Sequence, residues 1–263
     1  MILSKRVALN GDYLDELDES IVIRAVDPGV AHESSGTVNR MGGFGSRLTN
    51  QHWESRDVSV TFAINLQKTE LVRRREVFDT VIAWANRRGW LTTNQMEGRR
   101  IWVEKTVIPG GGDMWKWLSE YTITFKAFGV PFWQNRETAE ARKDRTSKGS
   151  TTIEVEGTAP NVLDITVENI SGAVNTNIKI WIGNENNVLE LKGSNLAANE
   201  NLILDHSPDG RLKIHADKNG TTRSLYSLLR GLNDTYVDPG TVEVGVISTR
   251  AVNLIVHNNA RWL

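Results

Sequence analysis

The segment "TFKAFGVPFWQNRETAEARKDRTSKGST", residues 124–151, changes character in its middle. Apolar residues first alternate and then end in the tripeptide Pro-Phe-Trp at 131–133, called here the Pro-Phe-Trp knot. Residues 134–150 contain no large apolar side chain. A folded core needs apolar side chains at a regular period, so this polar run predicts a break between two cores. We predict a domain over residues 1–135, a polar linker over 136–150 and a second domain over 151–263.

The composition is that of a globular chain that does not enter a bilayer. Of the 263 residues, 39% are hydrophobic and 24% are charged. No segment has the about eighteen uninterrupted apolar residues of a membrane span, so no membrane insertion is expected. The N-terminal stretch "MILSKRVALNGDYL" is too short in apolar residues for a signal peptide, which predicts synthesis in the cytoplasm.

Charge and cysteine content exclude several classes of chemistry. The chain has no cysteine, so disulfides, thiolate metal sites and thiol redox chemistry are excluded. Lys and Arg number 31 against 32 Asp and Glu, which is not the balance of a protein that binds phosphate backbones. We expect no specific nucleic-acid partner, and we interpret the arginine runs at 73–75, 87–88 and 99–100 as a solvated or subunit-facing surface.

The first half alternates between strand and helix patterns. In "VSVTFAINL", residues 58–66, every second residue is apolar, which predicts a strand with one buried face. Residues 70–88 then change to a helical period, with Thr69 as a predicted N-cap and Gly89 as a predicted C′ residue. "RRIWVEKTV" and "EYTITFKAF" alternate again and predict two further strands.

Two long loops in this half are candidates for contacts with other chains. Residues 28–53 show no clear apolar period over more than twenty residues. Residues 108–119 contain three glycines followed by two tryptophans, and a short loop seldom buries two indoles together. A different interpretation of the second loop remains open, in which one indole caps the barrel and the other lies on the surface. "GGFGS" in the first loop matches neither nucleotide-binding fingerprint, so no cofactor is expected. The candidate interface residues are Gly42, Phe44, Arg47, Trp53, Arg73, Arg74, Met114, Trp115 and Trp117.

The second half consists of short apolar runs separated by turn residues. The runs are spaced roughly every ten residues, and Gly172, Gly183, Gly193, Pro208-Asp209-Gly210 and Asp238-Pro239-Gly240 separate them. This spacing predicts an antiparallel β-sandwich or barrel. The runs are "TTIEVE", "VLDITVEN", "NIKIWIG", "NVLELKG", "ENLILD", "RLKIHA", "TVEVGV" and "AVNLIVHN".

The sequence contains no recognisable catalytic or metal-binding pattern. The histidines at 32, 52, 206, 215 and 257 have neither a His-Glu-x-x-His arrangement nor close ligand spacing. The segment "DHSPDG", residues 205–210, has the composition of a hairpin turn rather than of an ion site. Catalytic residues, metal ligands and cofactors are therefore all predicted to be absent, and we expect no enzyme.

The order of several segments resembles the distal tail protein family of long-tailed phages that infect Gram-positive bacteria. The segments are "VALNGDYL", "WESRDVSVTFAIN", one helix, "RRIWVEK", "TITFKAFGVPFW" and "EGTAPNVLDITVEN", and together they span almost the whole chain. The resemblance implies a mainly β fold, with an N-terminal split-barrel domain carrying one helix and a C-terminal galectin-like antiparallel β-sandwich.

The resemblance also implies a structural role and a set of partners. In that family the first domain closes into a six-membered ring that joins the tail tube to the tip. The implied partners are further copies of the chain, the major tail tube protein, a tail-associated lysin or tip protein and, in some phages, a receptor-binding protein. The implied location is the tail tip of a phage or prophage virion. A different tail-tube or baseplate component with a related barrel would fit the same pattern.

A short motif near the end of the chain suggests another function, carbohydrate binding. "HNNAR" places His257, Asn259 and Arg261 at spacings of two, which resembles the galectin sugar-binding motif. Ala260 stands where that motif has proline, and no tryptophan and glutamate follow at its spacing. A sugar site without these two groups loses much of its binding. The alternative of a carbohydrate-binding module stays open, and molar mass in solution separates it from a ring-forming protein.

Overall fold

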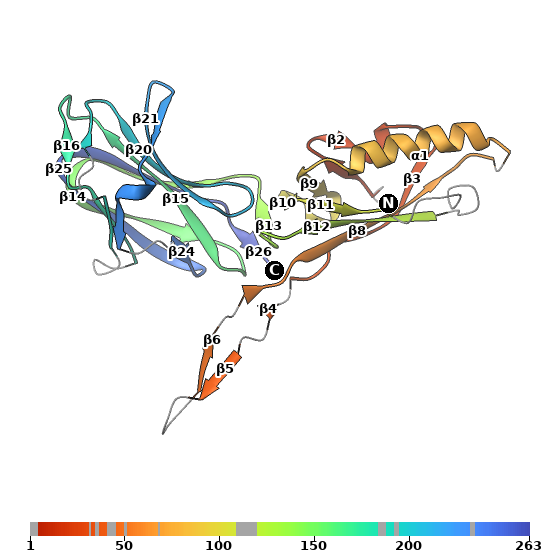
Figure 1. Ribbon diagram of the computed structural model, residues 1–263, viewed down its shortest axis with the longest axis horizontal. Helices are drawn as coiled ribbons and strands as arrows, with labels where there is room; N and C mark the ends of the chain where they lie inside the picture. Colours follow the sequence, from red (N-terminus) through yellow and green to blue (C-terminus); the bar gives the residue numbers. More distant parts are fainter. Residues whose placement is uncertain are drawn as a thin grey trace. The chain divides into compact units, whose positions relative to one another are not determined.

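The structure is a computed structural model that describes residues 5–31, 33–34, 37–40, 46–49, 52–67, 69–108, 120–183, 188–191, 195–231 and 235–263. The chain forms two compact units, Met1–Gln134 and Asn135–Trp262. Both units are built mainly from strands, and the described residues contain a single α-helix, α1 (Figure 1). The predicted mainly β class with one helix is confirmed.

Two sheets and one helix form the first unit. The first sheet has the order β2-β1-β9-β10-β13, the second has the order β11-β12-β8-β3, and β4 pairs with β7 and β5 with β6 in short ladders. Two 3-10 turns, η1 (Leu14–Glu16) and η2 (Asn94–Met96), follow β2 and β9. The strands are β1 (Val7–Leu9), β2 (Asp12–Tyr13), β3 (Ile21–Asp27), β4 (Glu33–Ser34), β5 (Thr37–Arg40), β6 (Ser46–Thr49), β7 (His52–Trp53), β8 (Arg56–Ile64), β9 (Gly89–Thr93), β10 (Arg99–Val103), β11 (Lys105–Val107), β12 (Glu120–Ala127) and β13 (Trp133–Asn135).

The pair β8–β12 has one apolar face and one polar face. The two strands are antiparallel in a register that places Phe62 opposite Tyr121. On the polar face, the hydroxyls of Thr61 and Thr122 lie 2.9 Å apart. The predicted alternation is confirmed, because successive side chains of a strand point to opposite faces. The buried residues of the apolar face are Val58, Val60, Phe62, Ile64, Tyr121, Ile123, Phe125 and Ala127.

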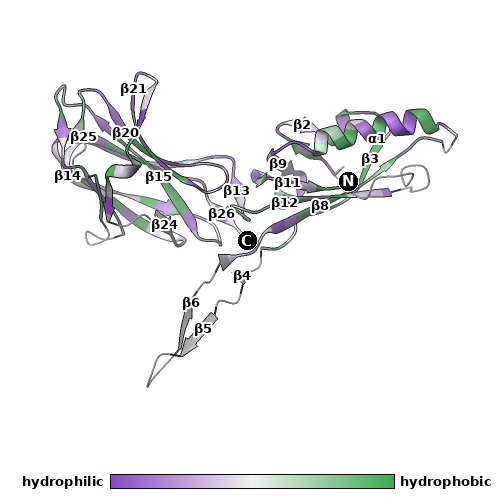
Figure 2. Ribbon diagram, in the orientation of Figure 1, coloured by the Kyte–Doolittle hydropathy of each residue, from purple (hydrophilic) through white to green (hydrophobic). Residues whose placement is uncertain are grey.

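Helix α1 (Leu71–Ala85) covers this apolar face with an amphipathic stripe. The ring of Phe78 lies 5.0 Å from Tyr121, and the indole of Trp84 meets Phe125 edge-on at 5.7 Å. Figure 2 shows green and purple segments following one another along the helix, as the helical period requires. The buried residues of α1 are Arg74, Val77, Val81, Trp84 and Ala85.

The helix begins one residue after its predicted start and ends three residues before its predicted end, and both predicted cap residues are wrong. The N-cap position is Glu70 rather than Thr69, and its side chain makes no cap hydrogen bond. At the other end the C-cap residue is Asn86, and the Oγ1 of Thr106 donates to the carbonyl of Ala85 at 2.6 Å, so a distant side chain binds one of the last helical carbonyls. Gly89 begins β9 instead. Its φ is +156°, and a Cβ there would lie 1.8 Å from the Asn10 side chain, which explains the need for glycine.

The second unit is a set of strands arranged around one aliphatic core. Its main sheet has the path β22-β21-β20-β15-β25-β17-β18-β23, with β14 paired to β25 and β24 paired to β15. One 3-10 turn, η3 (Tyr226–Leu228), precedes β23. The strands are β14 (Ala139–Val155), β15 (Asn161–Asn169), β16 (Asn175–Thr176), β17 (Lys179–Ile182), β18 (Val188–Leu191), β19 (Asn195–Leu196), β20 (Asn201–His206), β21 (Leu212–Lys218), β22 (Thr221–Ser224), β23 (Leu229–Gly231), β24 (Tyr236–Val237), β25 (Gly240–Asn258) and β26 (Arg261–Trp262).

Two long strands, β14 and β25, join the two layers of this unit. The first part of β25 pairs with β17, whereas its last part, from Val252, pairs with β15. Strand β14 follows β25 along both parts, with register shifts between Lys143 and Lys148. Bulges let a strand bend and pass from one layer to the next. The pair β14–β25 therefore forms an edge of both layers.

Most of the segment predicted as a polar linker, residues 139–150 of 136–150, belongs to this bent pair. From Ala139 onward the segment is strand β14, whose side chains are mostly exposed because one edge and one face of it meet solvent. Polarity therefore marked an edge strand rather than a connection between domains. The two predicted strands "TVEVGV" and "AVNLIVHN" are likewise one strand, β25.

Candidate functional site

Five of the predicted interface residues, Gly42, Phe44, Met114, Trp115 and Trp117, lie outside the described residues. Arg47 lies in β6, where its backbone is paired with Asn39 of β5. These predictions remain predictions.

The side chain of Trp53 packs against other residues of the first unit. It lies in β7 opposite Glu33, and its indole meets the ring of Phe132 edge-on at 5.1 Å. Phe132 is part of the Pro-Phe-Trp knot, whose next residue, Trp133, is fully buried and donates from its indole nitrogen to the carbonyl of Pro28 at 3.3 Å. The half-buried Trp53 therefore covers the knot, and only part of its ring is available to another chain.

The neighbouring arginines Arg73 and Arg74 have opposite environments. Arg73 is exposed and forms ion pairs with Asp18 and, at 3.6 Å, with Glu76. Arg74 is only 4% exposed. Its guanidinium donates to the carbonyls of Ile64 and Leu66 at 3.4 and 3.1 Å and to the Tyr121 hydroxyl at 3.3 Å. The prediction of Arg74 as a surface residue is wrong, because it is needed to bind carbonyls where β8 ends.

The described surface also carries exposed apolar residues that the sequence reasoning missed. Val72 on α1 is 76% exposed, Val30 is 63% exposed and Phe128 is 45% exposed. Val72 lies one residue before Arg73 and outside the buried stripe of α1, a position that the helical period could have indicated. Apolar residues on a surface are common singly, but they also occur at the centre of protein interfaces.

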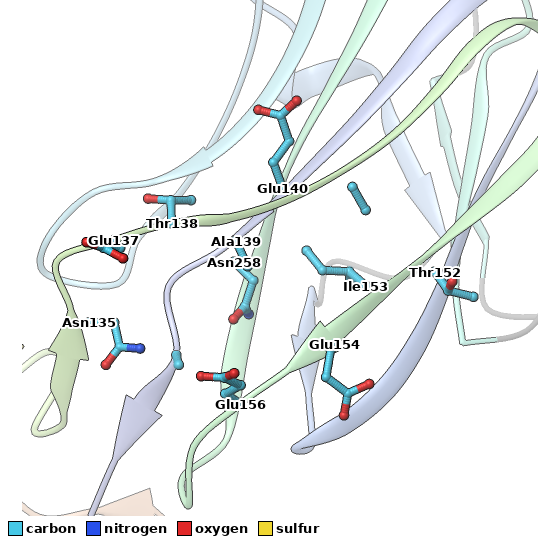
Figure 3. Close-up of a pocket in the computed structure, with 12 residues that line it drawn as sticks. Asn135, Glu137, Thr138, Ala139, Glu140, Thr152, Ile153, Glu154, Glu156 and Asn258 are labelled. Carbon is cyan, nitrogen blue, oxygen red and sulfur yellow. The ribbon is translucent and has the colours of Figure 1, made fainter.

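In the second unit, a pocket of about 380 Å³ lies at the β14 edge (Figure 3), and His257, Asn259 and Arg261 of the predicted sugar motif are not among its lining residues. His257 lies 3.8 Å from Glu140, and the Thr138 hydroxyl donates to the side-chain oxygen of Asn259 at 2.7 Å. The lining residues are Asn135, Glu137, Thr138, Ala139, Glu140, Ala141, Thr152, Ile153, Glu154, Glu156, Asn258 and Ala260.

The pocket is acidic and has no aromatic wall. Glu154 accepts a hydrogen bond from Thr241 at 2.7 Å, and Glu137, Glu140 and Glu156 also line the pocket (Figure 3). None of the twelve lining residues is aromatic or basic. Sugar sites commonly use an aromatic side chain as an apolar wall, so this pocket lacks one of their usual elements.

Arg261, the third residue of the sugar motif, is buried rather than available to a ligand. It is 4% exposed, and burial lowers the pKa of its guanidinium, which Tyr236 and Asp164 partly offset. Its carbonyl accepts hydrogen bonds from the backbone of Thr158 and Ala159 at 2.9 and 3.2 Å. His257 and Asn259 thus each contact one residue of the pocket wall, Glu140 and Thr138, without lining the pocket themselves, and Arg261 is buried.

One group of side chains near this pocket has the connectivity of a catalytic triad. The Nδ1 of His206 lies 2.8 Å from Asp164, and its Nε2 lies 2.9 Å from the Thr235 hydroxyl. Thr235 is only 1% exposed. A nucleophile must reach its substrate, and the buried Thr235 hydroxyl cannot. The hydrogen bonds of these three side chains instead connect β20 with the segment before β24.

The described part of the chain shows neither a metal-binding cluster nor a membrane-spanning helix. There, no three His, Cys, Asp or Glu side chains come together in a way that would hold a metal ion. No described helix is long and apolar enough to cross a membrane.

Comparison with known proteins identifies the fold. No family model and no curated protein matches the sequence. The structure is similar to the Dit protein (gp 19.1) of phage SPP1, described as a paradigm of the hub adsorption apparatus in phages infecting Gram-positive bacteria, with a TM-score of 0.63 and 15% identity over 98% of this chain and 99% of that chain. A chain of the phage P2 baseplate in its activated conformation with calcium matches with a TM-score of 0.48 and 7% identity, over 97% and 98% of the two chains. The chain therefore has the fold of a phage distal tail protein along its whole length.

Proposed function

We propose that this protein is a structural hub of a phage tail tip, in which six copies form a ring that joins the tail tube to the tip. The observation that supports the proposal most is the fold likeness to SPP1 Dit, which covers 98% of this chain and 99% of that protein. Both units are included in the match, so the likeness concerns the whole arrangement of elements along the chain and not one common sandwich. The virion tail tip is the location that this function requires, after synthesis in the host cytoplasm.

The proposed partners follow from the position of such a ring. One face meets the major tail tube protein, the other meets a tail-associated lysin or tip protein, and the second unit attaches a receptor-binding protein where a phage has one. The exposed Val30, Val72 and Phe128 of the first unit support its assignment to the ring contacts, because apolar side chains are enriched at the centres of interfaces. The role is structural and requires no catalysis.

Molar mass measured across a concentration series tests this function. We expect the full chain to approach six times its monomer mass of 29.4 kDa, and negative-stain images to show six-fold rings. A chain that stays monomeric at every concentration, and in the presence of the tail tube protein, would remove the ring from the proposal.

Carbohydrate binding remains the second candidate, because His257 and Asn259 contact Glu140 and Thr138, two residues that line one pocket. A glycan array with the full chain tests it. Galactoside binding that His257→Ala abolishes, in a chain that remains monomeric, would favour the binding module over the ring. Binding that His257→Ala leaves unchanged would place any glycan site elsewhere.

A further inference from the structure

The acidic pocket of the second unit lies between the two ends of the bent strand β14 (Figure 3). One wall comes from residues 137–141, where β14 begins, and the other from residues 152–154, near its end. All lining residues fall within 135–260, so the pocket belongs to the second unit alone. At about 380 Å³ it is large enough to receive a side chain from another molecule.

The lining of this pocket combines an apolar inner part with a negatively charged rim. Ile153 and Ala260 are buried and Ala141 is half-buried, so their apolar side chains line the inner part. The rim carries the exposed carboxylates of Glu137, Glu140, Glu154 and Glu156. A side chain with an apolar stem and a cationic end, such as lysine or arginine, is complementary to both parts.

The four carboxylates have no cationic partner of their own in the described part of the chain. There, no Lys or Arg forms an ion pair with any of them, and Glu140 has only His257, at 3.8 Å. Arg142 lies two residues after Glu140, but it binds Asp144 at 2.6 Å and Glu168 at 3.4 Å instead. A cleft lined by one sign of charge raises the local concentration of ions of the opposite sign. The pocket is therefore attractive to a cation from outside the chain.

The open edge of β14 gives such a partner a place for its backbone. Among the described strands, β14 pairs only with β25, so its other edge has no ladder. Edge strands often carry lysines that oppose pairing with a further strand. The basic residues of β14 all lie at its bend, within 142–148, whereas the charged residues of its two ends are Glu140 and Glu154. An extended partner segment can therefore lie along an end of β14 while one of its side chains enters the pocket.

We propose that this pocket binds a lysine side chain from an extended segment of a partner protein. The methylene groups of that lysine pack on Ile153 and Ala260, and its ammonium lies among the carboxylates of the rim. An ammonium has three donors that several carboxylates can share, whereas a guanidinium favours one carboxylate in its plane. This contact goes beyond the proposed ring and does not require it, because one second unit holds the whole pocket.

Four matched peptides test the chemistry of the occupant. The probe is acetyl-Thr-Gln-Thr-Lys-Thr-Gln-Thr-amide with a neutral fluorophore, and its analogues carry arginine, norleucine or glutamate at the centre. By fluorescence anisotropy with the full chain in low salt, we expect the lysine peptide to bind with a Kd of about 1 mM or less, and more weakly as salt is added. The norleucine peptide keeps the apolar stem without the charge, so it should bind at least about tenfold more weakly, as should the glutamate peptide.

A pair of double variants tests the location of the site. Glu154→Gln with Glu156→Gln removes two rim charges and leaves an acceptor for Thr241, so the lysine peptide should bind at least about tenfold more weakly at an unchanged melting temperature. Glu190→Gln with Asp217→Asn removes the same number of charges outside the pocket and should weaken binding less than about twofold.

Each contrary result overturns a defined part of the proposal. Equal weakening by the two double variants would show attraction to the overall charge and no site, and so would the absence of binding by the lysine peptide at about 5 mM. Equal binding of the norleucine peptide would overturn the role of the carboxylates, and tighter binding of the arginine peptide would overturn the choice of lysine. Molar mass measured on the same samples reports on the ring separately.

Discussion

The two units of this chain differ in what they place inside. In the first unit, α1 covers the apolar face of β8 and β12, and the interior includes two arginines, Arg56 and Arg74. In the second unit, two layers of strands cover each other, and the interior cluster is composed of Ile, Leu, Val and Ala side chains. The buried polar residues of this second unit are mostly neutral amides, such as Asn169, whose Nδ2 donates to the carbonyls of Ala173 and Ala197 at 2.8 and 2.7 Å.

This difference concerns which kinds of polar side chain each unit mainly buries. Neutral amides cost little to bury when they bind nearby carbonyls, whereas a guanidinium must have both acceptors and a balancing charge. The second unit nevertheless also buries one arginine, Arg261, whose guanidinium interacts with Tyr236 and Asp164. The first unit buries Arg56 and Arg74 and exposes Val30, Val72 and Phe128.

The largest expected effect comes from removing the buried guanidinium of Arg74, which donates to two carbonyls and a hydroxyl. Arg74→Met leaves the carbonyls of Ile64 and Leu66 without their donor, so we expect a loss of about 3 kcal/mol in the free energy of unfolding. Denaturant titration measures the loss, and hydrogen exchange should localise it to the end of β8 and to α1. Arg73→Met is the control. Its ion pairs are exposed and should contribute less than about 1 kcal/mol. Equal losses for the two variants would contradict the structural role of Arg74.

A somewhat smaller effect is expected from overpacking the second unit on its outer side. Gly245 of β25 lies opposite Trp181 of β17, and a Cβ at Gly245 would lie 2.1 Å from the indole. Gly245→Ala should therefore destabilise the protein by about 2 kcal/mol, since the ring must move. Trp181→Val is expected to relieve the contact, so Gly245→Ala should cost much less in that background. Additive losses in a denaturant titration would show that the indole does not limit this position.

The sequence predicted the strands with clear alternation and failed where polarity had another cause. Apolar and polar residues alternate over 58–64 and 121–127 because one face of each strand is buried. A period of two in the sequence therefore predicts these strands directly. Residues 139–150 are polar because β14 is an edge strand with one exposed face, and an isolated polar run cannot distinguish an edge strand from a linker. The two strands predicted after Gly240 are one because β25 passes between layers, which depends on pairing with β15 and β17.

The candidate sites were harder to predict because burial of a charged residue is not visible in a charge run. Arg73 and Arg74 are identical in type and adjacent in sequence, yet only Arg74 faces the end of β8. The helical stripe through Val77, Val81 and Ala85 includes position 74, so the period could have indicated its burial. In the same way, Arg261 fits a sugar motif by spacing, but in the structure its backbone forms a parallel β-bridge with Gly157.

The smallest expected effect concerns the ion pair between the buried Glu200 and the half-exposed Arg223 of the second unit, and it depends on pH. Glu200 is 6% exposed and binds Arg223 with both oxygens, at 2.7 and 2.8 Å. The hydrogen bond from Arg223 lowers the pKa of Glu200, with help from the backbone of Ala197 and against the cost of burial. Because the folded pKa lies below the unfolded value of about 4.3, the pair stabilises the protein fully above that value and loses its effect as the pH falls through the folded pKa.

Glu200→Gln should therefore cost about 1.5 kcal/mol at pH 7 and progressively less as the solution becomes more acid than about pH 4. Urea titrations of both proteins between pH 7 and pH 3 measure the difference. Glu190→Gln is the control, because its ion pair with Lys179 at 3.5 Å is more exposed and should contribute little at any pH. A Glu200→Gln deficit that stays constant down to pH 3 would show that packing rather than charge holds this residue. The second unit would then be free of buried charge pairs that matter for stability, which would make its contrast with the first unit sharper.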